Sequence, residues 1–256
     1  MVTIKSNREI ELMREAGRIT AYAHEMVRRA IKPGVSTYEL NEIAYKAIIS
    51  SGATPSFLNY NGFPASICAS VNEVVVHGIP SKKTILKNGD IISIDIGAIY
   101  HGYHGDAART HLVGDVKEEV KQLVKVTKES FFEGIKQAKP GNRLSDISHA
   151  IGTYAEKYGY GVVRDFTGHG IGTHMHEDPA IFNFGEAGHG LILKKGMTLA
   201  IEPMINLGTY RVRVLSDGWT TKTLDNQPSA HFENTIVITD DGCEILTKYE
   251  GEQFDV

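Results

Sequence analysis

The sequence predicts an α+β fold that consists of two similar halves. Helical periodicity recurs in four segments, and short apolar runs typical of strands lie between them. Two short strings also recur at one offset of 107 residues: Lys32-Pro33-Gly34 matches Lys139-Pro140-Gly141, and Leu86-Lys87-Asn88-Gly89 matches Leu193-Lys194-Lys195-Gly196. Each string by itself is an ordinary turn or loop that chance produces easily, but the shared offset indicates a duplication.

Helices are predicted where apolar residues recur at three- and four-residue spacing. This pattern runs from Asn7 to Ala30, with Ser6 and Asn7 as candidate N-caps. A second helix is expected to begin at Ser36, because Ser36 and Glu39 form a capping-box motif, and to end at Gly52. Two further helices are predicted over 116–138 and 144–158.

Strands are predicted over 91–96, 107–113, 198–205 and 234–239. The first two are expected to form a hairpin around Tyr100-His101-Gly102. The 107-residue offset carries Asp95 in the first strand onto Glu202 in the third. A duplicated fold therefore predicts two carboxylates that face one another across a pseudo-twofold axis.

Composition and charge exclude several classes of protein. The 256 residues are 41% hydrophobic and 23% charged, so the chain can bury a large core. A net charge of -4 argues against a partner such as DNA. Residues 1–9 lack the apolar stretch of a signal peptide, and no later run approaches the roughly 18 apolar residues of a membrane helix. With Cys68 and Cys243 as its only cysteines, the chain is expected in the reducing cytoplasm.

Four acids lie in or beside the apolar strands: Asp95, Asp106, Glu202 and Glu233. A buried carboxylate costs several kcal/mol unless a cation or good hydrogen bonds compensate it. Asp95 and Asp106 are expected nearly opposite one another in the hairpin, where they need a shared proton or a metal ion. Any single acid could instead pair with Arg109, cap a turn or face solvent. Four such acids together favour a metal site.

One histidine is the strongest candidate for the nitrogen ligand of such a site. His169 lies among glycines in 167–172, where small neighbours allow backbone or substrate to approach closely. His77 and His176 also stand out, although burial in the core is the commoner fate of such residues. The remaining histidines are interpreted as structural or exposed: His24, His101, His104, His111, His149, His189 and His231.

In order and local context, five of these residues resemble the metal ligands of the methionine aminopeptidase family: Asp95, Asp106, His169, Glu202 and Glu233. The strings at 72–80, 105–110, 168–172 and 202–204 extend the resemblance, which covers essentially the whole chain. Without a zinc-binding extension or a large insertion, the chain resembles the compact bacterial type I enzymes.

The resemblance implies the pita-bread fold, in which a curved antiparallel sheet carries helices on its outer face. One catalytic domain, 1–256, would have pseudo-symmetric halves at about 1–115 and 116–256. The implied activity is removal of the initiator methionine from nascent polypeptide N-termini, with preference for a small second residue. A cytoplasmic monomer is expected, with transient association with the ribosome as a candidate interaction.

The resemblance also implies two divalent metal ions, Co, Mn, Fe or Zn, which activate a water molecule for hydrolysis. Asp106 and Glu233 would bridge both ions, Asp95 would hold one, and His169 with Glu202 the other. Glu202 would also shuttle a proton.

By the same resemblance, His176 would stabilise the developing oxyanion and His77 would bind the scissile amide. The substrate pocket would be lined by Tyr60, Phe63, Cys68, His77, His176 and Trp219. Phe57, Phe63 and Met175 stand at pocket positions where some relatives carry other residues. One monovalent cation is implied near Asn72, Val74 and Ser229.

Two alternatives remain. X-Pro aminopeptidases and prolidases share the five ligands but usually carry a separate N-terminal domain, for which this sequence has no room. A non-catalytic pita-bread binding module is disfavoured because all five ligand positions are intact. Two lysine clusters are candidates for contact with ribosomal RNA, although solvated surface is the interpretation we favour. They are Lys82, Lys83 and Lys87, and Lys121, Lys125 and Lys128.

Overall fold

The computed structural model describes residues 2–249 and confirms all four predicted helices. They are α1 (Asn7–Ala30), α2 (Thr37–Ser50), α3 (Glu118–Ile135) and α4 (Leu144–Glu156), with a short 3-10 helix, η1 (Tyr60–Gly62). The third helix is shorter than predicted at both ends. Among the described residues, no helix combines the length and the apolar composition needed to cross a bilayer.

Local capping determines where the first two helices begin. The Ser6 backbone N–H donates to Glu9 Oε2 at 2.7 Å, and the Glu9 N–H donates back to Ser6 Oγ at 3.4 Å. Ser36 and Glu39 form the same reciprocal pair at 2.8 and 3.2 Å. Both pairs satisfy backbone donors that a helix N-terminus leaves free. The predicted capping box of α2 is therefore confirmed.

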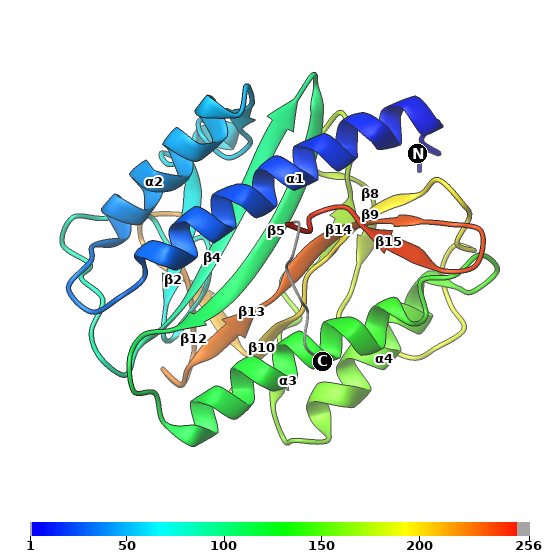
Figure 1. Cartoon of the computed structure of the whole chain (residues 1–256). Coiled ribbons are helices and arrows are strands. Elements are labelled where there is room, and N and C mark those ends of the chain that lie inside the picture. Colours follow the sequence, from blue (N-terminus) through cyan, green and yellow to red (C-terminus); the bar gives the residue numbers. More distant parts are fainter. Residues whose placement is uncertain (1, 250–256) are drawn as a thin grey trace.

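The helices lie over one large antiparallel sheet (Figure 1). Its order is β1-β4-β5-β14-β9-β7-β8, with β2 paired to β4 and β15 paired to β14. These strands are β1 (Thr54–Pro55), β2 (Ile67–Val71), β4 (Ile91–Tyr100), β5 (Tyr103–Leu112), β7 (Gly168–Gly170), β8 (Glu177–Ile181), β9 (Thr198–Ile201), β14 (Glu233–Ile238) and β15 (Cys243–Ile245).

Two three-stranded sheets flank the large one. The first has the order β13-β10-β6, with β13 (Ser229–His231), β10 (Met204–Asn206) and β6 (Gly161–Val162). The second has the order β11-β12-β3, with β11 (Val212–Val214), β12 (Thr221–Thr223) and β3 (Val74–Val76).

Each half of the chain buries its own helix pair against the sheet. In the first half, Ile19 of α1 and Leu40 of α2 pack with Ile94 of β4. In the second half, Phe131 of α3 and Ile147 of α4 pack in one cluster with strands β9 and β14. Side chains alternate along a strand, so residues between the core positions face away from the helices. The other face of the sheet is where the acids lie.

The predicted duplication is confirmed by contacts that recur 107 residues apart. The Gly34 N–H donates to the Leu86 carbonyl at 2.8 Å, and the Gly141 N–H donates to the Leu193 carbonyl at 3.0 Å. Gly34 has φ 94° and Gly141 has φ 92°, a conformation that glycine adopts without strain. The recurring Lys-Pro-Gly turn therefore docks on the recurring loop in both halves.

The structure corrects one prediction about the strands and makes another more exact. The predicted strand over 198–205 is divided into β9 and β10 by Glu202 and Pro203, because proline cannot donate to a ladder. In the hairpin, Asp95 lies opposite Ala108 and Asp106 lies opposite Gly97. The two acids are therefore diagonal neighbours on one face, two positions out of register, and do not lie directly opposite one another.

Candidate metal centre

Five chain segments bring the predicted ligands to one pocket. Asp95 comes from β4, Asp106 from β5, His169 from β7 and Glu233 from the start of β14, while Glu202 lies in the break after β9. Strand β14 joins the halves, because Glu233 pairs with Ala108 of β5 and Asn234 pairs with Ile201 of β9. The site therefore lies where the two halves meet.

The glycines beside His169 allow its strand to fit between two neighbours. A Cβ at Gly168 would lie 2.4 Å from the Ala200 carbonyl oxygen of β9. A Cβ at Gly170 would lie 2.0 Å from the Asp178 carbonyl oxygen of β8. Neither position can carry a side chain without moving backbone. The small residues thus hold His169 in place by permitting close packing of strands.

A hydrogen bond orients the His169 ring. His169 Nδ1 lies 2.9 Å from the Gly170 carbonyl oxygen, which only accepts, so Nδ1 carries the proton. Nε2 is then left with its lone pair, 3.8 Å from Asp106 Oδ2 and 3.6 Å from Glu202 Oε1. An imidazole held by a carbonyl at one nitrogen and facing carboxylates at the other is the usual arrangement of a metal-binding histidine.

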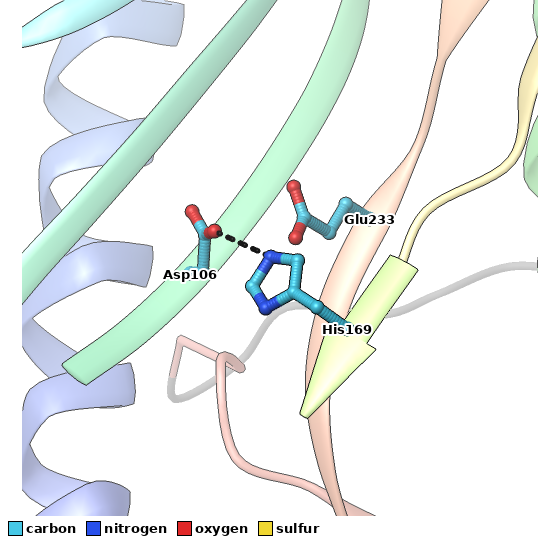
Figure 2. A group of neighbouring side chains, drawn as sticks. All are labelled: Asp106, His169 and Glu233. Carbon is cyan, nitrogen blue, oxygen red and sulfur yellow. Dashed lines mark ion pairs between the residues drawn. The ribbon is translucent and has the colours of Figure 1, made fainter. Parts of the chain in front are cut away.

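Figure 2 shows three of these side chains, from three strands, pointing toward a common point. One possible ligand atom each from Asp106, His169 and Glu233 lies within 4.8 Å of the others. All three side chains are buried. This spacing allows a single cation to contact all three.

The acids are electrostatically strained. Burial, together with the neighbouring Glu202, raises the pKa of Asp95 to about 7. Burial and the adjacent carboxyls raise the pKa of Asp106 and of Glu233 well above the ordinary range, and burial does the same for Glu202. Within residues 2–249, Asp95 Oδ1, Asp106 Oδ1 and Glu233 Oε1 are buried without a hydrogen-bond partner.

These observations fit a divalent cation. A cation would compensate the buried charge and occupy the unpaired oxygens. Four carboxyls and one imidazole form an oxygen-rich set, which suits ions of the Mn, Fe or Co type and tolerates Zn. The alternative partner, Arg109, donates instead to the Glu233 carbonyl oxygen at 2.5 Å and to Asn234 Oδ1 at 2.7 Å.

His77 and His176 lie in the same pocket. His176 Nδ1 is 2.8 Å from the Tyr60 hydroxyl oxygen, and its ring centroid is 4.3 Å from that of His169. His77 has a left-handed backbone, φ 59°, which a non-glycine residue adopts at a cost of about 1–3 kcal/mol. Burial lowers the pKa of His77 to about 4 and also lowers the pKa of His176. Both rings are therefore neutral at neutral pH.

The rest of the pocket is largely aromatic. Trp219 packs edge-on against Phe63 with the ring centroids 5.2 Å apart, and against His77 at 6.1 Å. Burial, reinforced by Asp95, raises the pKa of the Cys68 thiol well above its usual range, so it stays protonated. All predicted substrate residues line this pocket, together with Phe57, Asn61 and Met175: Tyr60, Phe63, Cys68, His77, His176 and Trp219.

One residue at the site was not anticipated. His231, interpreted from the sequence as structural or exposed, is buried with Nε2 3.6 Å from Glu202 Oε2. Burial lowers its pKa to about 4. The spacing His231-x-Glu233 could have indicated its place at the site, because residues two apart along an extended chain share a face.

The residues expected near a monovalent cation lie outside the pocket lining. Asn72 has φ 52°, and its carbonyl oxygen accepts the Ser229 N–H at 2.9 Å. Val74 begins β3 close by in the chain. The structure thus brings Asn72 and Ser229 together, and the cation itself stays a prediction.

A pocket with four clustered carboxyls, an oriented imidazole and two further neutral histidines is the site of a metal-dependent hydrolase. The profile of metallopeptidase family M24 matches residues 11–240. The chain belongs to this family. Divalent metal ions are therefore its cofactors.

Relatives of known structure and function agree with this assignment. A methionine aminopeptidase of Clostridium acetobutylicum is 55% identical over 98% of this chain and 100% of its own length. The crystal structure of a methionine aminopeptidase from Thermotoga maritima superposes with a TM-score of 0.96 at 48% identity, covering 97% of this chain and 100% of that one. A prolidase from Pyrococcus furiosus gives a TM-score of 0.79 at 27% identity, covering 96% of this chain and 66% of that one. The pita-bread fold expected from the sequence is thereby confirmed.

Proposed function

We propose that this protein removes the N-terminal methionine from new proteins and peptides, in a metal-dependent reaction that prefers a small second residue. The observation that carries the proposal is the pocket in which the Nε2 lone pair of His169 faces clustered, strained carboxyls. The methionine aminopeptidases that match this chain over nearly their whole length support the choice of substrate.

Two divalent ions per chain are part of the proposal. Asp106 and Glu233 would hold both ions, Asp95 one of them, and His169 with Glu202 the other. The number of carboxyls supports two ions, because one divalent cation would compensate only two of the four carboxylates. Co, Mn, Fe and Zn remain the candidates. When bound, the ions supply a Lewis acid and lower the pKa of a water molecule.

The histidines would act on the scissile bond. If the Tyr60 hydroxyl donates to His176 Nδ1 across their 2.8 Å contact, His176 Nε2 carries the proton and donates to the carbonyl oxygen. His77 would donate to the scissile amide and assist protonation of the leaving group. Glu202 would shuttle the proton taken from water.

The methionine side chain would enter the aromatic part of the pocket. Phe63 and Trp219 present ring faces and edges, and Cys68 presents a neutral thiol. A thioether gains about 0.3–1.5 kcal/mol from each such aromatic contact. Phe57 and Met175 add apolar surface and would adjust the shape of this pocket.

The remaining parts of the proposal concern the setting of the enzyme. We propose one catalytic domain over 1–256 in a cytoplasmic monomer that acts on nascent N-termini, with a weak monovalent-cation site at Asn72, Val74 and Ser229. Transient ribosome association has little support on α3, because Lys121 and Lys125 lie 2.6 and 3.7 Å from Glu118 and Glu129. That face is better interpreted as solvated surface.

Peptide hydrolysis after metal removal tests the proposal. Chelator-treated protein is expected to release no methionine from Met-Gly-Met, and Mn²⁺ or Co²⁺ is expected to restore release. Activity that survives rigorous chelation would refute the metal mechanism. Faster cleavage of Ala-Pro peptides than of Met-Ala peptides would indicate an X-Pro peptidase instead.

A substitution separates catalysis from binding. His169→Ala is expected to abolish hydrolysis, while His189→Ala, at a histidine whose side chain is 70% exposed, serves as the matched control. Loss of activity in both variants, or in neither, would contradict the assignment. A cellular role that persists with His169→Ala would revive a non-catalytic binding module.

A further inference from the structure

His231 is held at the candidate metal centre from two sides. It ends β13, where it pairs with Met204 of β10. On its other side, the Thr110 hydroxyl of β5 accepts the His231 N–H at 2.9 Å and donates to the His231 carbonyl oxygen at 2.8 Å. The backbone of this residue is therefore clamped between the two halves of the chain.

The side chain points at two acids. His231 Nε2 lies 3.6 Å from Glu202 Oε2 and 3.9 Å from Glu233 Oε2. Only 2% of the residue is exposed, and within residues 2–249 Nε2 has no hydrogen-bond partner. With both acids ionised, as metal binding requires, a lone pair at Nε2 would repel them, so the attractive tautomer carries its proton at Nε2. Nε2 is thus a buried donor that faces an acceptor.

The two oxygens of Glu202 face different imidazoles. Oε1 lies 3.6 Å from His169 Nε2, and Oε2 lies 3.6 Å from His231 Nε2. Because His169 Nε2 is a lone-pair nitrogen, Oε1 is the oxygen directed to the same cation. Oε2 is therefore the carboxylate oxygen that does not face this cation.

Glu202 needs such support because its own backbone lies outside the strands. It stands in the break between β9 and β10, where the fully buried Asn183 donates to the Glu202 carbonyl oxygen at 3.0 Å. That bond holds the main chain but leaves the carboxylate free to rotate. A second contact is required to determine which carboxylate oxygen of Glu202 faces the metal ion.

We propose that His231 is a positioning residue, whose Nε2–H binds Glu202 Oε2 and so directs Oε1 to the metal ion beside His169. The inference rests on the proposed two-metal function. Groups that orient a metal ligand are typically worth about 10- to 100-fold in metal affinity or activity. A loss of this size is the effect to measure.

Calorimetric titration of the metal-stripped protein with Mn²⁺ tests the proposal. His231→Leu places a branched apolar side chain without a hydrogen-bond donor at this position. It is expected to weaken Mn²⁺ binding about 10- to 100-fold at the affected site. His231→Gln restores an N–H donor and is expected to stay within about threefold of the unsubstituted protein. With saturating metal, His231→Leu is expected to lower kcat more than it raises KM, because Glu202 acts in the chemical step.

Two controls make each outcome decisive. His189→Leu, at an exposed histidine, is expected to leave metal affinity unchanged. Thermal unfolding in chelator identifies a variant that is misfolded. If His231→Leu is misfolded, the metal affinity of His231→Gln tests the proposal instead. Unchanged metal affinity in His231→Leu would overturn the inference, and so would equal losses in the Leu and Gln variants. Absence of metal binding in the unsubstituted protein would instead refute the proposed function.

Discussion

Replacing Asp95 with asparagine is expected to stabilise the metal-free protein and to destabilise the metal-bound one. Asp95→Asn keeps the shape of the side chain and removes its charge. Burial raises the pKa of Asp95 from 3.8 to about 7. A group with a raised native pKa contributes fully to stability below its unfolded pKa, and this contribution is lost as the pH rises through its native pKa.

The magnitude follows from the size of the pKa change. A rise from 3.8 to about 7 corresponds to about 4 kcal/mol of destabilisation above pH 7. Because Asp95 lines a pocket that is open to water, a discount to about 2–4 kcal/mol is appropriate. For a chain of this size the change corresponds to a rise in Tm of roughly 5–15 °C.

Thermal unfolding measures the effect under three conditions. In chelator at about pH 8, Asp95→Asn should melt above the unsubstituted protein, and at about pH 4 the gap should close. In Mn²⁺ at about 1,000 times its Kd, the unsubstituted protein should gain about 4.1 kcal/mol, which offsets the advantage of about 2–4 kcal/mol that the variant has in chelator. The order should then reverse, because the variant has lost a ligand.

Asp115→Asn, at an exposed aspartate, is the control and should change little under any condition. The reasoning is refuted if Asp95→Asn lowers the Tm in chelator at about pH 8, or changes it equally at about pH 8 and about pH 4.

Other perturbations test the surroundings of the site. Lys5 Nζ lies 2.7 Å from Glu177 Oε2 with both side chains nearly buried, so Lys5→Met should lower the free energy of unfolding in urea by about 3 kcal/mol. Adding Glu177→Gln should recover part of this loss, and a purely additive double variant would contradict the buried pair. Gly168→Ala should lower both Tm and metal affinity, because its Cβ would lie 2.4 Å from the Ala200 carbonyl oxygen; unchanged metal affinity would show that β7 accommodates it. Trp219→Ala should raise KM for methionyl peptides about tenfold with little change in kcat, in steady-state kinetics. Since burial raises the pKa of the site carboxyls, metal binding near pH 6 should release protons, measured by calorimetry in buffers of different ionisation enthalpy. Binding without proton release would show that these carboxyls are already ionised.

Features that depend on a few neighbouring residues were predictable from the sequence. The helix from Asn7 to Ala30 follows from its apolar spacing, and the start of α2 follows from Ser36 and Glu39 three residues apart. The duplication was also predictable from the sequence, because the turn at Gly34 and its counterpart at Gly141 need the same conformation and therefore similar residues.

The five candidate ligands were found partly by physics and partly by resemblance. Their position in apolar strands marked Asp95, Asp106, Glu202 and Glu233 as acids that need compensation. The glycine-rich setting made His169 the strongest histidine candidate, and the family pattern then assigned it as a ligand. The structure adds the reason for its glycines, which is the close approach of backbone from β8 and β9.

By itself, the sequence determined the helices, the repeated halves and the acids that need a cation, because each depends on short-range patterns. Only the tertiary structure decided the diagonal register of Asp95 and Asp106 and the place of His231 beside Glu202. These features depend on which distant strands pair and in which register, and a slip of one residue sends every side chain to the opposite face. No local pattern around His231 encodes its contacts with Met204 and Thr110, which arise only when the two halves pack together.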